Sequence, residues 1–118
     1  MKFMGTTDDI LKTMQDYSIY AMTSITECFP MVLLEALSVG LSIISYNCPT
    51  GPQFIVKNNE NGFLCENKED FKSKLLKLVH DDNLRRQFSL NAKKNAEKFT
   101  ENEVMIKWKN LFVNLQNV

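Results

Sequence analysis

Two carboxylates lie on either side of a proline at the start of a predicted helix. Glu27 comes before Pro30, and Glu35 follows that proline by little more than one helical turn. Residues 31–39 are apolar nearly all round, which predicts a buried helix. Proline suits the first position of a helix because its missing N–H would have no partner there anyway. Both glutamates are therefore expected near the amino-terminal end of this helix.

The predicted helix start offers backbone donors to an anion. Phe29 would be the cap residue, and its side chain has no acceptor. The N–H groups of Met31 and Val32 then lack a side-chain partner, and unpaired donors at the positive end of a helix favour a phosphate. Ionised carboxylates such as Glu27 and Glu35 accept hydrogen bonds from vicinal hydroxyls. A diphosphate beside hydroxyl groups is the chemistry of a nucleotide sugar.

A purely structural interpretation of the same residues stands beside this one. Ser24 and Glu27 have the spacing of a capping box for a helix that begins near Ile25. Glu35 would then be a buried acid satisfied by local hydrogen bonds. Spacing alone leaves both interpretations open.

The surrounding elements predict an α/β fold. Strands are predicted at 2–4, 18–24, 41–46 and 63–65, and three final helices at about 68–80, 82–97 and 101–116. Nearly continuous apolar strands alternating with helices indicate a parallel sheet with helices on both faces. Ligands of such sheets bind beyond the carboxyl ends of the strands. The loops 25–30 and 47–52 are therefore expected to lie there together.

Local signals predict where several helices begin and end. Thr7 is expected to cap a short first helix, and Gly40 to end the helix that begins after Pro30. Thr100 and Glu103 form a capping-box pattern before the last helix. That helix carries an apolar stripe made of Val104, Trp108, Leu111, Phe112 and Leu115.

Composition narrows the class of protein. A chain of 118 residues with 44% hydrophobic and 24% charged residues fits one compact domain and excludes wholesale disorder. Fourteen basic residues balance fourteen acidic ones, which argues against a dedicated nucleic-acid binder. The three cysteines form no CxxC pair and suggest reduced thiols in the cytoplasm. Because His80 is the sole histidine, a histidine-rich metal site is excluded.

One segment is nearly long enough to cross a membrane. Residues 28–46 carry a single charge, Glu35. Pro30, Gly40 and the central carboxylate argue against a spanning helix. The segment is predicted to be a buried helix followed by a buried strand.

The chain resembles a known family over nearly its whole length. Residues 27–45 look like the E-x7-E signature of retaining, nucleotide-sugar-dependent glycosyltransferases with two Rossmann-like domains, the glycosyl transferases group 1 family. Residues 47–55 are similar to the D-x-P-x-G-P-x-E-I-I loop of its bacterial surface-polysaccharide members. Asn61–Leu64 matches the family's N-G-x-L turn, and Trp108–Phe112 its closing W-x-x-L-[YF] helix.

This resemblance implies a fold and a domain organisation. The fold would be the carboxyl-terminal half-domain of the GT-B type: a Rossmann-like parallel sheet with helices on both faces, followed by an all-helical stretch. Residues 1–118 would form a single partial domain, the donor-binding portion of the enzyme.

The resemblance also implies roles for individual residues. Contacts to the donor sugar would come from Glu27, Cys28 and Phe29, contacts to the diphosphate from Met31 and Val32, and contacts to the ribose from Glu35. No catalytic residue is assigned. Neither a metal nor another cofactor is expected, because the helix end and basic side chains stabilise the departing diphosphate. Cys28 stands where the family usually has glycine, and its side chain could narrow or abolish sugar binding.

The full enzyme implied by the resemblance would transfer a hexose with retention. The donor would be a UDP- or GDP-hexose, and the acceptor a polysaccharide, lipid-linked or protein-linked glycan. The acceptor-binding amino-terminal domain and the family's Arg/Lys pair are absent from these residues, so this chain alone is expected to be inactive. We expect it in the cytoplasm, at the inner face of the membrane, with the last helix exposed or buried in a homodimer.

Two other classes of protein compete with this interpretation. A receiver-type signalling domain would fit the length and Asp8–Asp9, but the second half of the chain reads as helix only. A non-catalytic domain that binds phosphate or a peripheral membrane surface would use the basic residues of the later helices. These are Lys72, Lys74, Lys77, Arg85, Arg86, Lys93, Lys94 and Lys98.

Overall fold

The computed structural model describes residues 1–117. The chain forms, in order, α1 (Ile10–Met14), β1 (Ile19–Met22), α2 (Met31–Ser38), β2 (Ser42–Tyr46), the 3-10 turn η1 (Pro52–Phe54), β3 (Gly62–Cys65), α3 (Lys68–His80), α4 (Asp82–Ala96), the 3-10 turn η2 (Glu97–Phe99) and α5 (Glu101–Gln116). The predicted strand at residues 2–4 is wrong. Those residues are exposed and irregular. A strand needs a hydrogen-bonded neighbour, and the described sheet contains β1, β2 and β3 only.

The three strands form one parallel sheet in the order β1-β2-β3. Ile19 of β1 pairs with Ser42 of β2, and Ile43 of β2 pairs with Gly62 of β3. The central strand is apolar on both faces, as Ile43 and Ile44 are both fully buried. A parallel sheet covered on both sides requires such a strand.

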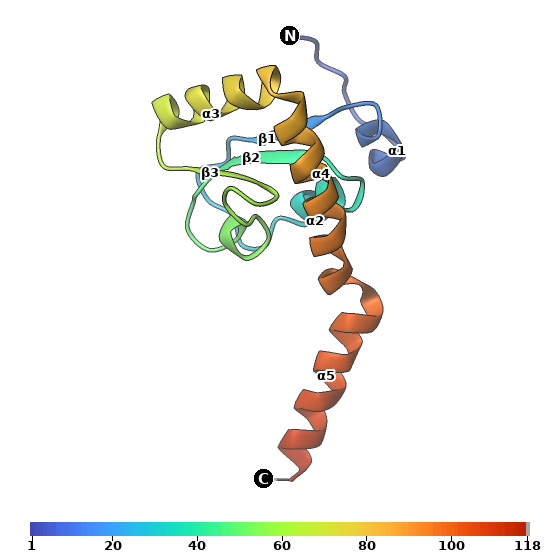
Figure 1. Ribbon diagram of the computed structural model, residues 1–118. Coiled ribbons are helices and arrows are strands. Elements are labelled where there is room, and N and C mark those ends of the chain that lie inside the picture. The colour runs from blue at the N-terminus through green and yellow to red at the C-terminus, as the bar shows by residue number, and fades with distance from the viewer. Residues whose placement is uncertain (118) are drawn as a thin grey trace.

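Helices cover both faces of this sheet, which confirms the predicted α/β architecture (Figure 1). Ile43 packs in a core with side chains of α1 and α2 and with Ile55 and Val56, which follow η1. Its neighbour Ile44 points the opposite way, into a core with Phe71 and Leu78 of α3 and Phe88 of α4. The alternation of side chains along a strand explains why two adjacent isoleucines serve different cores.

The first helix begins later than the sequence suggested. Asp9, not Thr7, is its cap: the Asp9 carboxylate accepts the N–H of Lys12 at 3.0 Å. Thr7 lies two residues before this cap, and its hydroxyl contacts the Thr13 hydroxyl at 2.9 Å and the Asp9 carbonyl at 3.3 Å. A carboxylate beside the helix start is the stronger acceptor, so it takes the capping position.

The predicted end of α2 at Gly40 is confirmed. Gly40 has a φ of 81°, a left-handed conformation that glycine adopts without cost. Its N–H donates to the Leu37 carbonyl, and the N–H of Leu41 donates to the Ala36 carbonyl, both at 3.0 Å. These two bonds form a Schellman motif, which turns the chain directly into β2.

The last helix projects away from the rest of the molecule (Figure 1). Thr100 caps it as predicted, accepting the N–H of Glu103 at 3.4 Å. No residue from Glu101 to Gln116 is buried, and the molecule measures 54 × 31 × 29 Å. Across residues 1–117, every helix falls short of the length and apolarity that crossing a bilayer demands.

Candidate functional site

Two loops meet beyond the carboxyl ends of β1 and β2, as the sequence predicted. Glu27 and Thr50 form a parallel bridge, and the Thr50 hydroxyl donates to the Glu27 carbonyl at 2.6 Å. Thr50 has a φ of 71°, which is uncommon for a β-branched residue. The loops 25–30 and 47–52 are thus tied together at their backbones.

Glycine is required where these loops touch. A Cβ atom on Gly51 would overlap the Pro30 ring and lie 2.9 Å from the Cys28 carbonyl oxygen. Pro30 and Gly51 are both buried. The loop after β2 therefore packs directly against the backbone that leads into α2, because Gly51 has no side chain to keep the two loops apart.

Pro30 occupies the cap position of α2 and not the first helical position. Its φ of −73° and ψ of 96° are extended, so helical geometry begins at Met31. The Pro30 carbonyl accepts the N–H of Leu33 at 2.9 Å. Phe29 consequently lies one residue before the cap, which corrects the sequence-based prediction. The reason is that a proline ring constrains φ but leaves ψ free to be extended.

With Pro30 as its cap, the start of α2 is open to an anion. A proline cap has no side-chain acceptor, and within the described chain no side chain caps this helix. Because the Pro30 carbonyl takes up the N–H of Leu33, the donors at the tip are those of Met31 and Val32. The competing prediction of a helix beginning near Ile25 is wrong. Residues 25–29 form a loop with bends at Ile25 and Cys28, and its backbone is bridged to Thr50 at Glu27.

The charges of both glutamates act on the phenol of Tyr20 in β1. Glu27 and Glu35 are each half-buried. Burial raises the pKa of the Tyr20 phenol above its usual value, and the charges of Glu35 and Glu27 raise it further. Tyr20 lies on the α2 face of the sheet, packed against the core there. Sequence reasoning did not single out Tyr20; the alternation of side chains along β1 is the signal that could have found it.

The remaining predicted residues lie in the loop before α2 and in the first turn of that helix. Cys28 is exposed with a free thiol, and the Met31 side chain is 60% exposed. Val32 is half-buried against the α2 core. The Phe29 ring lies against the ring of Phe99 from η2, with 6.3 Å between the centroids and 55° between the planes. The six predicted residues are therefore brought together at one end of the sheet, around the start of α2.

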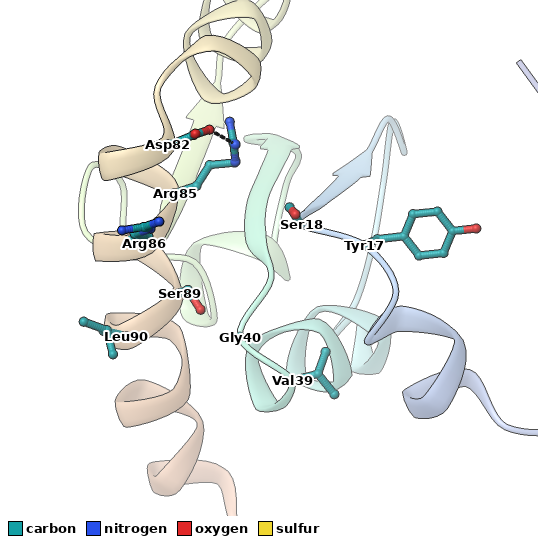
Figure 2. Close-up of a pocket in the computed structure, with 9 residues that line it drawn as sticks. All are labelled: Tyr17, Ser18, Val39, Gly40, Asp82, Arg85, Arg86, Ser89 and Leu90. Atoms are coloured by element: carbon teal, nitrogen blue, oxygen red, sulfur yellow. Dashed lines mark hydrogen bonds and ion pairs between the residues drawn. The ribbon is translucent and has the colours of Figure 1, made fainter.

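A separate cavity of about 600 Å³ lies at the opposite, amino-terminal end of β1 and β2 (Figure 2). Ser18 before β1, Gly40 before β2, and Arg85 and Arg86 of α4 line it. The guanidinium of Arg85 donates to the carbonyls of Leu78 and Val79 and pairs with Asp82. Arg85 therefore joins the end of α3 to the start of α4.

The three cysteines of the chain are all reduced thiols in the part that the structure describes. Within residues 1–117 the three cysteines are free, and Cys48 and Cys65 are buried. Burial raises the pKa of the Cys65 thiol to about 11, partly opposed by the nearby Lys74 ammonium. Over the same residues, no three His, Cys, Asp or Glu side chains gather where they could share a metal ion.

A family pattern, glycosyl transferases group 1, matches residues 1–95. The chain belongs to this family of glycosyltransferases. An uncharacterized glycosyltransferase of Haemophilus influenzae is 33% identical over 113 residues, which are 94% of this chain and 32% of that protein. The poly(ribitol-phosphate) alpha-N-acetylglucosaminyltransferase of Staphylococcus aureus is 31% identical over 111 residues, 92% of this chain and 22% of that protein.

Solved structures of larger proteins share the fold. TarM of S. aureus superposes with a TM-score of 0.80 at 30% identity over 90% of this chain and 22% of its own. A TarM variant was solved in complex with UDP and superposes with a TM-score of 0.72 at 28% identity, over 86% of this chain and 21% of that one. Anabaena HepE in complex with UDP has a TM-score of 0.81 at 23% identity, over 99% of this chain and 32% of that one. The chain spans about a third or less of these relatives, and its fold is that of the GT-B glycosyltransferases.

Proposed function

We propose that this chain is the portion of a retaining glycosyltransferase that binds the nucleotide-sugar donor. The observation that carries the proposal is the uncapped start of α2, set between two half-buried glutamates beyond the carboxyl ends of the strands. A helix start of this kind attracts a diphosphate, and the carboxylates beside it accept from hydroxyl groups.

Each predicted residue has a role in this proposal. The N–H groups of Met31 and Val32 bind the diphosphate, and Glu35 accepts from the ribose hydroxyls. Glu27, with the backbone N–H groups of Cys28 and Phe29, contacts the donor sugar. The helix end stabilises the charge of the departing nucleoside diphosphate without a metal ion or other cofactor. The Cys28 side chain, in the place of the usual glycine, narrows the sugar pocket.

The donor we propose is a UDP- or GDP-hexose. The S. aureus TarM variant and Anabaena HepE, which share this fold, were both solved with UDP. The acceptor would be a glycan of a surface polysaccharide, as the relative that acts in amylovoran biosynthesis in Erwinia amylovora suggests at 32% identity. We place the reaction in the cytoplasm at the inner face of the membrane, where lipid-linked acceptors lie.

The partner we propose is an acceptor-binding domain. Relatives carry two thirds or more of their length outside the region that this chain matches. The exposed apolar face of α5 gives such a domain a surface to pack on. Phe99, just before α5, contacts Phe29 in the loop 25–30, which we call the donor loop. Without an acceptor-binding domain, the 118-residue chain binds the donor but does not transfer the sugar.

Nuclear magnetic resonance tests donor binding directly. On titrating UDP or GDP into the labelled chain, we expect the amide signals of Met31 and Val32 to shift at millimolar ligand. Glu35→Ala should weaken binding about tenfold or more, since hydrogen bonds to charged groups contribute strongly. Glu69→Ala, an exposed glutamate on α3, is the matched control and should bind as the wild type does. Unchanged Met31 and Val32 signals with both nucleotides at millimolar concentration would refute the proposal.

The alternative, a basic surface for phosphate or membranes, receives less support. Lys74 pairs with Asp70 at 3.0 Å and also donates to the Leu64 carbonyl. Arg85 is engaged by Asp82 and by backbone carbonyls. Two of the basic residues on which this alternative depends are therefore already partnered within the fold.

A further inference from the structure

The donor loop between β1 and α2 is held at three points. At its middle, the Glu27 backbone is bridged to Thr50. At its end, Pro30 packs without a gap on Gly51. The partners at these two points, Thr50 and Gly51, belong to the loop after β2. The third is the Phe29 side chain, which rests on Phe99 of η2, seventy residues later in the chain.

The third contact joins a partly exposed side chain to a distant part of the chain. Phe29 is 44% exposed, so its ring is not enclosed by the core. Phe99 is half-buried and lies in a short 3-10 turn between α4 and α5. The rings meet in a tilted geometry at 6.3 Å, within the range of favourable aromatic pairs. Removing the Phe99 ring would take this contact away from Phe29.

We propose that Phe99 is a positioning residue for the donor loop. It acts through the Phe29 ring, and thereby orients the backbone N–H groups of Cys28 and Phe29 between the Glu27 bridge and the start of α2. Phe99 itself contacts no donor. The consequence for binding rests on the proposed function, whereas the ordering of the loop does not.

The position of Phe99 links this loop to the last helix. Phe99 is the final residue of η2, and Thr100 immediately after it caps α5. The support of Phe29 is therefore separated from α5 by Thr100 alone.

Backbone dynamics of the ligand-free chain, measured by NMR relaxation, test the ordering of the loop. In Phe99→Ala we expect the heteronuclear NOE of the Cys28 and Phe29 amides to fall, while that of the β2 and α3 amides stays as in the wild type. Phe99→Trp, which retains a ring, should restore the wild-type values. Phe54→Ala, which removes a 64% exposed phenylalanine from η1, is the matched control and should leave both amides unchanged. Unaltered NOE values of Cys28 and Phe29 in Phe99→Ala, or an equal fall over the whole chain, would overturn the proposal.

Binding of UDP or GDP provides a second readout. Using whichever nucleotide binds, we expect Phe99→Ala to weaken affinity about two- to tenfold, the range that one aromatic pair supports, and Phe54→Ala to leave it unchanged. Equal affinity of Phe99→Ala and wild type would overturn the effect on binding. If the wild-type chain binds neither nucleotide, the proposed function fails, and the relaxation experiment on the ligand-free chain still decides the role of Phe99.

Discussion

At the scale of single residues, Gly51 has no room for a side chain. Alanine there would overlap the Pro30 ring and approach the Cys28 carbonyl, so the two loops would have to separate. We expect Gly51→Ala to lower the free energy of unfolding by about 1–3 kcal/mol, as overpacking does, in urea denaturation. Gln53→Ala, at an exposed position two residues on, is the control and should change it by less than about 0.5 kcal/mol. A Gly51→Ala variant as stable as the wild type would show that the loops separate without cost.

Cys65 makes stability depend on pH in the alkaline range. Burial raises the pKa of its thiol from 9.0 to about 11, so the folded chain holds this proton more tightly than the unfolded chain. The contribution of this thiol to the free energy of unfolding is complete below pH 9 and is lost as the pH rises to 11. The loss should be up to about 2–3 kcal/mol. Cys65→Ala should flatten the decline measured by denaturation at pH 8 to 11, and an unchanged decline would assign it to other groups.

At the scale of elements, Arg85 fastens α3 to α4. Its guanidinium binds the last carbonyls of α3, at Leu78 and Val79, and Asp82 in the first turn of α4. Helix ends leave such carbonyls unpaired unless another group donates to them. We expect Arg85→Ala to cost about 1–3 kcal/mol in thermal or urea unfolding. Arg86→Ala, at the adjacent exposed position, should cost less than about 0.5 kcal/mol, and equal losses would contradict a specific role for Arg85.

At the scale of the whole molecule, α5 leaves a large apolar surface uncovered. Its exposed hydrophobic residues include Trp108, Leu111 and Phe112, each about half exposed, and the rings of Trp108 and Phe112 stack on each other with centroids 5.8 Å apart. A surface of this kind promotes association. The isolated chain should therefore self-associate with rising concentration in light scattering, with a blue shift of Trp108 fluorescence.

Charges on the apolar stripe should abolish this association. We expect the double variant Leu111→Lys with Phe112→Lys to remain monomeric with an unchanged circular dichroism spectrum, because neither side chain belongs to either core. Asn110→Lys adds a charge outside the stripe and should associate as the wild type does. A wild-type chain that stays monomeric at millimolar concentration, with fully exposed Trp108, would show that α5 needs no cover. An acceptor domain that binds α5 should compete with self-association.

Much of the fold follows from local patterns. The alternation of short apolar runs with amphipathic helices predicted the parallel sheet, and the caps at Gly40 and Thr100 ended or began helices where expected. Local signals failed in two places, where two neighbouring residues could both cap a helix and where a strand depended on a distant partner. Asp9 displaced Thr7 as a cap, and the strand predicted at residues 2–4 lacked a partner to pair with.

Some features of the candidate site could likewise be predicted from the sequence, and others depend on the tertiary structure. The residues of the motif, Glu27 to Glu35, could be identified from their order along the chain, because a helix start and its flanking acids are neighbours in sequence. Tertiary structure decided the extended Pro30 cap, the bridge to Thr50 and the contact of Phe29 with Phe99. Those contacts join residues that are far apart in sequence. Their geometry depends on how the sheet and helices pack together, which no local pattern of residues records.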